Sequence, residues 1–234
     1  MSSVEPHPRS SQNWLSALRA GVLGANDGIV SVAAVVVGVA AATSDRGEIV
    51  TAGGAALLGG AVSMALGEYV SVSSQRDSER AMIHQEQVEL ATEPAAELDE
   101  LTAIYEAKGL APGTARQVAH ELSAQDPLGA HLDAELGIDA DDLVSPWRAG
   151  AASALAFLAG GILPVLAVLL PETVRIPVTA AVVLVALAAT GAVGARLGRS
   201  PVARPTVRVV MGGALALAAT YALGTVLGTS GVVG

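Results

Sequence analysis

Five long apolar stretches constrain this chain more than any other feature of its sequence. They cover residues 20–43, 49–70, 149–170, 176–195 and 207–227. Each is close to the ~20 residues that a helix needs to cross about 30 Å of hydrocarbon. Hydrophobic residues make up 52% of the chain and aromatic residues only 3%. The apolar surface therefore comes from small side chains, which let helices pack closely in lipid. These features predict an all-α membrane protein with five transmembrane helices.

Arginines in the short connections predict how these helices cross the membrane. Six of them fall on one side in a five-span arrangement: Arg9, Arg19, Arg196, Arg199, Arg204 and Arg208. The other side has Arg46 and Arg175. An excess of arginine marks the cytoplasmic side. We therefore expect the N-terminus and the segment between the second and third helices to be cytoplasmic, and the C-terminus to lie on the opposite side.

The segment between the second and third apolar helices differs from the rest in charge. Residues 75–148 hold 16 of the 22 acidic residues and 5 of the 13 basic residues, a net charge of −11; the whole chain is −9, so the remainder is +2. We predict a disordered N-terminal tail (1–17), the first two transmembrane helices (18–74), an acidic cytoplasmic helical domain (75–145) and the last three transmembrane helices (146–234). The negative charge argues against nucleic acid as a partner, because phosphate binding needs positive charge.

Prolines and glycines divide the acidic segment into short helices. The second apolar helix shows no stop signal and is expected to continue past Ser73 to about residue 91, before Pro94. Further helices are predicted over residues 95–107, 112–124 and from Pro127 to the glycine at position 137. Proline is favoured at the first turn of a helix and glycine just past its end. The acidic segment is therefore predicted to be helical throughout.

One ionisable residue lies inside an apolar stretch. Asp27 stands about 10 Å past the cytoplasmic end of the first helix, at 1.5 Å per residue. A charged group there costs on the order of 3 kcal/mol and usually faces a partner or a watery path. An interfacial acid at a helix end is the alternative, but aspartate is too short to reach the interface easily. The sequence therefore favours a place for Asp27 on an ion path.

Two residues of the second helix are candidates for the same path. Antiparallel packing brings Met64 to about the depth of Asp27, and a carboxylate with a thioether favours transition metals over calcium. A methionine in an apolar helix is more often simple packing. Glu68 lies one turn nearer the cytoplasm on the same face. It is either a waiting site at the mouth of the path or an interfacial carboxylate.

The acidic segment repeats a spacing that converges ligands on one helix face. Glu86 and Glu89 are three residues apart, as are Glu97 and Glu100, while His131 and Glu135 are four apart. Carboxylates and an imidazole that face a bundle interior bind divalent transition metals. A solvated acidic helix is the alternative, because such clusters are common. The chain has no cysteine, so a thiolate site is excluded.

Three stretches make the chain resemble the vacuolar iron transporter family, whose members move ferrous iron, and often manganese, out of the cytosol. They are residues 24–30 (Gly-Ala-Asn-Asp-Gly-Ile-Val), residues 61–71 (Ala-Val-Ser-Met-Ala-Leu-Gly-Glu-Tyr-Val-Ser) and residues 160–164 (Gly-Gly-Ile-Leu-Pro). The resemblance extends over residues 18–227 and includes the five spans and the acidic insert after the second.

The resemblance implies a homodimer with the ion path between subunits, lined by the first two helices of each. Ion-path residues of plant relatives fall on Asp27 and Met64. Metal ligands of the family's insert fall on Glu86, Glu89, Glu97, Glu100 and Glu135. A neighbouring methionine pair would fall on His131 and Leu132, so this chain departs from the family pattern there. Members of this type are thought to exchange metal for protons.

The sequence thus predicts a carrier, not an enzyme, that exports ferrous iron, or manganese, by proton exchange. Its partners would be divalent ions (Fe²⁺, Mn²⁺ or Zn²⁺), the lipid bilayer and a second copy, with no prosthetic group. The membrane would be the inner cell membrane in a bacterium or a vacuolar type in a eukaryote. One alternative is a membrane-anchored metal sensor or buffer without transport. A di-iron carboxylate enzyme would need Glu-x-x-His pairs, and no glutamate here has histidine at that spacing.

Overall fold

The computed structural model describes residues 10–139 and 144–230, with side chains at the N-terminal end from Ala20 onward. Within these residues every regular element is helical. The chain divides into two compact units, one formed by residues 1–70 and 146–234 and the other by Ser71–Ser145. The second unit begins four residues before the boundary at residue 75 that the charge pattern predicted.

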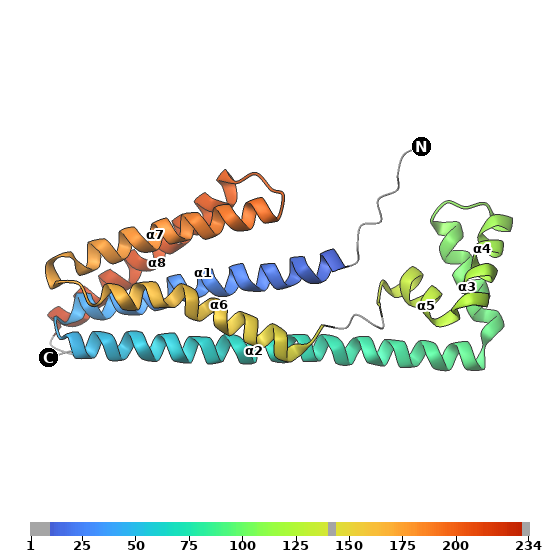
Figure 1. Cartoon of the computed structure of the whole chain (residues 1–234), viewed down its shortest axis with the longest axis horizontal. Helices are drawn as coiled ribbons and strands as arrows, with labels where there is room; N and C mark the ends of the chain where they lie inside the picture. Colours follow the sequence, from blue (N-terminus) through green and yellow to red (C-terminus); the bar gives the residue numbers. More distant parts are fainter. Residues whose placement is uncertain (1–9, 140–143, 231–234) are drawn as a thin grey trace. The chain divides into compact units, whose positions relative to one another are not determined.

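The first unit holds five helices long and apolar enough to cross a membrane, as the sequence predicted. They are α1 (Ser10–Ala42), the first part of α2 (Arg46–Thr92), α6 (Pro146–Ala167), α7 (Glu172–Leu197) and α8 (Ala203–Thr229). Figure 1 shows α1 running beside α6, with α7 and α8 together on its other side. The prediction of an all-helical fold with five long apolar helices is therefore confirmed for the described residues.

Helix α1 is the centre of this bundle. Its Val32 and Val36 belong to a buried cluster with residues of α2 and α6, and its Ala33 and Val37 to a second cluster with α7 and α8. Small residues allow the close approach: a Cβ added to Gly28 would lie 2.1 Å from the carbonyl oxygen of Phe157. These contacts fix the rotation of α1 about its own axis.

Helix α2 continues without a break to Thr92, as predicted. From Glu68 to Thr92 its sequence has neither glycine nor proline, and helix extension past a formed turn is favourable. The end before Pro94 follows from the clash that proline imposes on the preceding residue. One helix therefore belongs partly to each unit.

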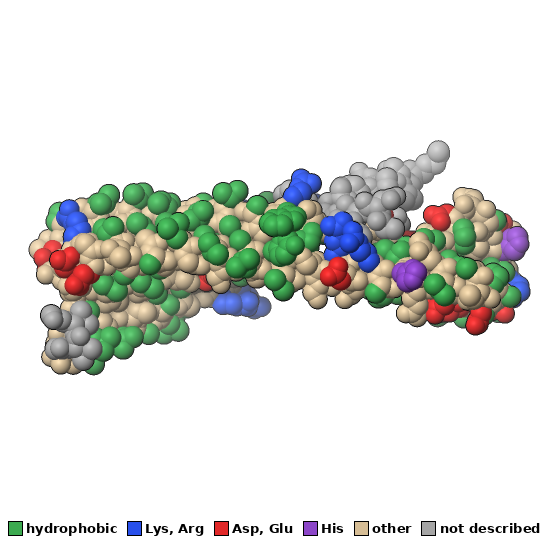
Figure 2. Space-filling model, turned by 90° about the horizontal axis from the view of Figure 1, so that it is seen from below, with side chains coloured by type: hydrophobic (Ala, Val, Ile, Leu, Met, Phe, Trp, Pro, Cys, Tyr) green, Lys and Arg blue, Asp and Glu red, His purple; other side chains and the backbone are tan. Residues whose placement is uncertain are grey.

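The second unit continues with α3 (Pro94–Ala107), α4 (Pro112–Gln125) and α5 (Pro127–His131). Glycines with positive φ follow two of its helical segments, Gly109 (+99°) and Gly137 (+64°). The predicted fourth helix is split: α5 ends at His131 and a π-helical turn, η1 (Leu132–Leu136), completes it. Figure 2 shows acidic and histidine side chains gathered on this unit and hydrophobic ones spread over the first.

The predicted N-terminal tail requires a correction. Helix α1 begins at Ser10, inside the segment 1–17 that was expected to be disordered. Residues 10–19 contain neither glycine nor proline, so the helix that starts in the apolar stretch extends backward through them. Residues 1–9 lie outside the described residues.

Candidate metal sites

Three of the predicted ligands meet in the second unit. Glu86 of α2, Glu97 of α3 and His131 of α5 offer ligand atoms that all lie within 4.8 Å of one another. The Nδ1 atom of His131 is 3.0 Å from Glu86 Oε1 and 3.6 Å from Glu97 Oε2. All three side chains are buried, with exposed fractions of 1% for His131, 4% for Glu86 and 7% for Glu97. We call these three residues the buried triad.

The triad has polar atoms without hydrogen-bond partners. Both ring nitrogens of His131 and the Oε1 atom of Glu86 are buried and unpartnered among the described residues. The 3.0 Å contact between His131 Nδ1 and Glu86 Oε1 is thus close without being a hydrogen bond. Buried polar groups nearly always have a partner, and a bound ion can take the place of that partner.

The electrostatic surroundings of the triad favour a bound cation. Burial raises the pKa of Glu86 to about 7, and the nearby carboxylates of Glu135, Glu97, Glu89 and Glu100 add to the rise. Burial likewise raises the pKa of Glu97, with Glu100 as the next cause, whereas His131 opposes the rise. A divalent cation would offset this repulsion between like charges.

The other three predicted ligands surround the triad without joining it. Glu89 is half-buried and accepts a hydrogen bond from Gln85, while Glu100 and Glu135 are exposed. Burial raises the pKa of Glu135, and Glu100 is the next cause of the rise, so these carboxylates lie within electrostatic reach of one another. They form an acidic shell around a buried nitrogen and two buried carboxylates.

Local structure accounts for the position of His131 beside the carboxylates. Asp126 caps α5 by accepting a hydrogen bond from the backbone N–H of Gly129. Lys108, just after α3, donates to the carbonyl oxygen of Ala134 in η1. The cap and the Lys108 contact therefore hold the end of α5 in place relative to α3.

In the first unit, the side chain of Asp27 points outward from the helix bundle. Asp27 is exposed on α1, and Ser31, one turn away, donates a hydrogen bond of 2.8 Å to its Oδ1 atom. Its neighbours on the other faces are packed: Gly24 and Gly28 lie against α6. A carboxylate within a membrane-spanning helix usually faces a partner or a water-filled path. Because Asp27 faces away from the bundle, that partner would lie outside the described part of this chain.

Asn26 and Thr190 form a polar contact that sequence reasoning missed. The Thr190 hydroxyl of α7 donates to the side-chain oxygen of Asn26, and both residues are partly buried. A hydrogen bond between transmembrane helices holds them at one rotation. A signal was present in the sequence, because Asn26 stands directly beside Asp27. Its hydrogen-bond partner Thr190, 164 residues away in the sequence, could not be predicted from the sequence.

Met64 and Glu68 lie half-buried on α2. Gly60 of α2 packs against the Phe157 ring and Gly28 of α1 against the Phe157 carbonyl, so these two positions share one depth in the bundle. Met64 is one turn from Gly60, and Asp27 is next to Gly28. Met64 packs against the buried cluster around Phe157, whereas Asp27 is exposed. The two side chains therefore lie within about one helical turn of the same depth, but in different surroundings.

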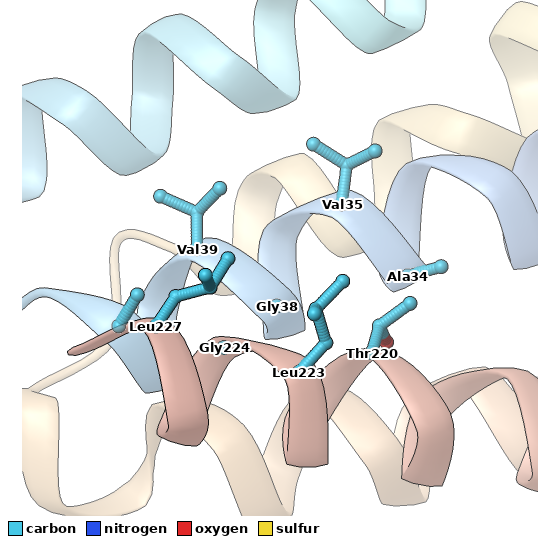
Figure 3. A pocket seen from close by; sticks show the side chains of 9 residues that line it. Ala34, Val35, Gly38, Val39, Thr220, Leu223, Gly224 and Leu227 are labelled. Atoms are coloured by element: carbon cyan, nitrogen blue, oxygen red, sulfur yellow. The ribbon is translucent and has the colours of Figure 1, made fainter. Parts of the chain in front are cut away.

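A pocket of about 350 Å³ opens between α1 and α8, lined mainly by apolar groups such as Val35, Val39 and Leu223 (Figure 3). The Thr220 hydroxyl at its edge already donates to carbonyl oxygens of its own helix. None of the residues that line it carries a charge. This pocket therefore does not offer ligands to a metal ion.

Comparison with known proteins places the chain in a family. The model of the VIT family matches residues 18–225. The chain belongs to the VIT family. Relatives include the vacuolar iron transporter of Acanthamoeba castellanii, 44% identical over 209 residues, or 88% of this chain and 77% of that protein. Vacuolar iron transporter homolog 5 of Oryza sativa subsp. japonica is 38% identical over 222 residues, or 94% of this chain and 83% of its own.

A third relative, vacuolar iron transporter homolog 2 of Arabidopsis thaliana, is 36% identical over 217 residues, or 92% of this chain and 86% of its own. The VIT match confirms the resemblance drawn from the three sequence stretches. It covers both α1, with Asp27, and the unit that holds the buried triad. The VIT family assignment and the five apolar helices together make this chain a multi-pass membrane protein of a metal-transport family.

Proposed function

We propose that this protein is a carrier that exports ferrous iron from the cytosol. The observation that carries the proposal is the exposed carboxylate of Asp27 within a membrane-spanning helix of a VIT family chain. The relatives are named for iron transport. A carboxylate at this depth costs free energy, and a mere membrane anchor would not require it.

The insert gathers metal before transport in this mechanism. The buried triad supplies two carboxylates and an imidazole, and Glu89, Glu100 and Glu135 supply further negative charge around it. Iron would pass from there to Glu68 and then to Asp27 with Met64. Manganese is a second cargo that the same donor types accept. Asp27 or Glu68 would take up a proton as metal leaves. A protonated carboxyl group costs less free energy within the membrane than a charged one does.

A second copy of the chain would complete the path. Leu23, Asp27 and Val35 lie on an exposed face of α1, and Leu58 and Leu66 are exposed on α2. Two such faces together would bury apolar area and place two Asp27 carboxylates around one polar route. This arrangement removes the cost of a charge facing lipid. The path in our proposal therefore runs between subunits of a homodimer.

Metal uptake into sealed vesicles tests the proposal. Iron and manganese uptake would be measured with and without a pH gradient, for the parental chain, Asp27→Asn and the control Glu172→Gln, an exposed acid at the start of α7. Asp27→Asn keeps size but removes the charge that offsets a divalent cation in low dielectric. We expect transport to collapse in Asp27→Asn, with folding and metal binding by the insert retained, and to persist in Glu172→Gln.

The outcomes separate this function from a membrane-anchored sensor or buffer. That rival is favoured by one observation: the triad comes entirely from residues 71–145 and would bind metal without a path. Parental vesicles that bind metal but accumulate none would support the rival. Asp27→Asn vesicles that take up iron at the parental rate would remove Asp27 from the mechanism.

A further inference from the structure

His131 is a buried imidazole that lacks the hydrogen bonds such a residue ordinarily makes. Its side chain is 1% exposed, and neither ring nitrogen has a hydrogen-bond partner among the described residues. Buried histidines ordinarily donate or accept through at least one nitrogen. Here the Nδ1 atom instead lies close to two carboxylate oxygens, at 3.0 and 3.6 Å. The ring is held where a ligand would be.

The distances from His131 Nδ1 to the two carboxylate oxygens are those of ligands that share one metal ion, and ligand atoms of all three residues lie within 4.8 Å of one another. Ligand atoms about 2.0–2.2 Å from a four-coordinate ion lie roughly 3.4 Å from one another. The two distances from His131 Nδ1 bracket that value. Calcium would need six to eight oxygen ligands at longer distances, whereas the triad buries only two carboxylates. The small number of buried ligands, one of them a nitrogen, thus favours a transition-metal ion over calcium.

We propose that His131 is the residue that sets the metal preference of the insert, ranking borderline first-row ions such as Fe²⁺, Co²⁺ and Zn²⁺ above Mn²⁺, Mg²⁺ and Ca²⁺. The proposal rests on the function proposed above, in which the insert gathers cargo metal. Imidazole nitrogen suits iron, cobalt and zinc, while sites built only of oxygen suit magnesium, calcium and manganese. Without His131, the surrounding glutamates would offer oxygen alone.

The alternative is a buried ion pair that binds no metal. A protonated His131 beside Glu86 and Glu97 would offset part of their repulsion and would hold α5 against α2 and α3. Replacing His131 would then destabilise the unit but would not change the order in which metals bind. Metal ranking is therefore the measurement that separates the two roles.

Binding to the purified full-length chain in detergent, measured by competition against a chromophoric chelator, tests the assignment with Zn²⁺, Co²⁺ and Mn²⁺. The variants are His131→Gln, whose amide offers oxygen in a side chain of similar reach, and the control His120→Gln, an exposed histidine of α4. We expect His131→Gln to weaken Zn²⁺ and Co²⁺ binding about tenfold or more and Mn²⁺ binding by less than about threefold. His120→Gln should leave all three unchanged.

Pulsed electron paramagnetic resonance of the Mn²⁺-loaded chain gives an independent readout. Nitrogen modulation from one histidine should be present in the parental chain and in His120→Gln but absent from His131→Gln. If His131→Gln loses helical content, His131→Met serves as a second variant, with the same loss of nitrogen modulation expected.

The outcomes are distinguishable. Suppose Glu86→Gln abolishes metal binding but His131→Gln leaves the ratio of Zn²⁺ to Mn²⁺ affinity at its parental value. That result would overturn this inference and leave the gathering function intact. An equal loss for all three metals in a folded His131→Gln chain would overturn it as well, in favour of the ion pair. Failure of the parental chain to bind any of the three would overturn this inference and the gathering role of the insert, whereas iron uptake into vesicles tests export by itself.

Discussion

At the scale of single residues, glycine decides how α1 meets its neighbours. Gly28 stands directly after Asp27, and a Cβ there would lie 2.1 Å from the main-chain oxygen of Phe157. Backbone cannot move aside as a flexible side chain can, so any larger residue must push α1 and α6 apart. The same residue that permits the close contact therefore also sets the direction in which Asp27 points.

Gly28→Ala should destabilise the protein. Overpacking in a close-packed interior typically costs about 1–3 kcal/mol, and we expect a loss of about 2 kcal/mol or more, measured as a lower unfolding temperature in detergent. Gly21→Ala is the matched control, because nothing lies within 4 Å of a Cβ at that position of the same helix. The control should be neutral or slightly stabilising, since alanine favours helix more than glycine. Equal effects of the two changes would contradict the packing argument.

At the scale of elements, the second unit shows how helix ends position a site. The turn at Pro94 lets α3 bring Glu97 back toward Glu86 of α2, and the capped helix α5 brings His131. These contacts gather negative charge in a buried place, which raises the pKa of Glu86 to about 7. The cluster is therefore sensitive to protons in the same range in which it would bind metal.

Metal-free protein should lose stability in this unit as pH rises. Folded Glu86 holds its proton up to a pKa of about 7, whereas its ordinary value is 4.5. Protonation thus stabilises the fold below that range, and the contribution is lost between pH 4.5 and about 7, by at most about 1.4 kcal/mol for each pH unit. Hydrogen exchange of α3 amides should speed up accordingly, and Glu86→Gln should remove most of the change. A pH response that persists unchanged in Glu86→Gln would contradict this account.

Bound metal should reverse this pH dependence, so that the second unit becomes more stable as pH rises. Ligands must be deprotonated to bind, so the protection that Zn²⁺ gives to α3 should be strong at about pH 7.5 and weak at about pH 5.5. The same hydrogen-exchange experiment measures it, with Ca²⁺ as the comparison ion. Equal protection at both pH values would show that the carboxylates with raised pKa are not the ligands.

At the scale of the whole molecule, five helices long and apolar enough to cross a membrane predict that the two ends of the described chain lie on opposite sides of it. The arginine distribution predicts which side is which. A reporter inserted after Asp139 should read cytoplasmic, and one fused after Gly234, a position outside the described residues, should read non-cytoplasmic. Reporters that both read the same side would overturn the five-span topology.

Assembly of two copies can be tested by cysteine cross-linking, because the chain has no native cysteine. Leu23 is 60% exposed on the same face of α1 as Asp27, and Leu155 is 66% exposed on α6. If two α1 faces meet around Asp27, Leu23→Cys should form a covalent dimer under mild oxidation, whereas Leu155→Cys should not. Cross-linking of both variants to the same extent would indicate random collision rather than a specific dimer.

Local sequence patterns were enough to predict the helices and their type. Helix length, apolar composition and the prolines and glycines predicted the five spans, the continuous α2 and the insert helices to within a few residues, because these depend on local backbone preference and hydrophobicity. The predicted start of α1 was wrong, because the sequence before the apolar stretch carries little local signal for where the helix begins. The ionisable residue in the first span was also evident from its position in the apolar stretch.

Which residues come into contact could be learned only from the packing of the helices. Six ligands were predicted in the insert, but burial selects Glu86, Glu97 and His131 from three different helices and leaves Glu100 and Glu135 exposed. Likewise, close packing of α1 on α6 and α7 turns Asp27 outward. The physical reason is that a contact between side chains distant in sequence depends on helix rotation and crossing, which are set by interdigitation of many side chains rather than by local spacing.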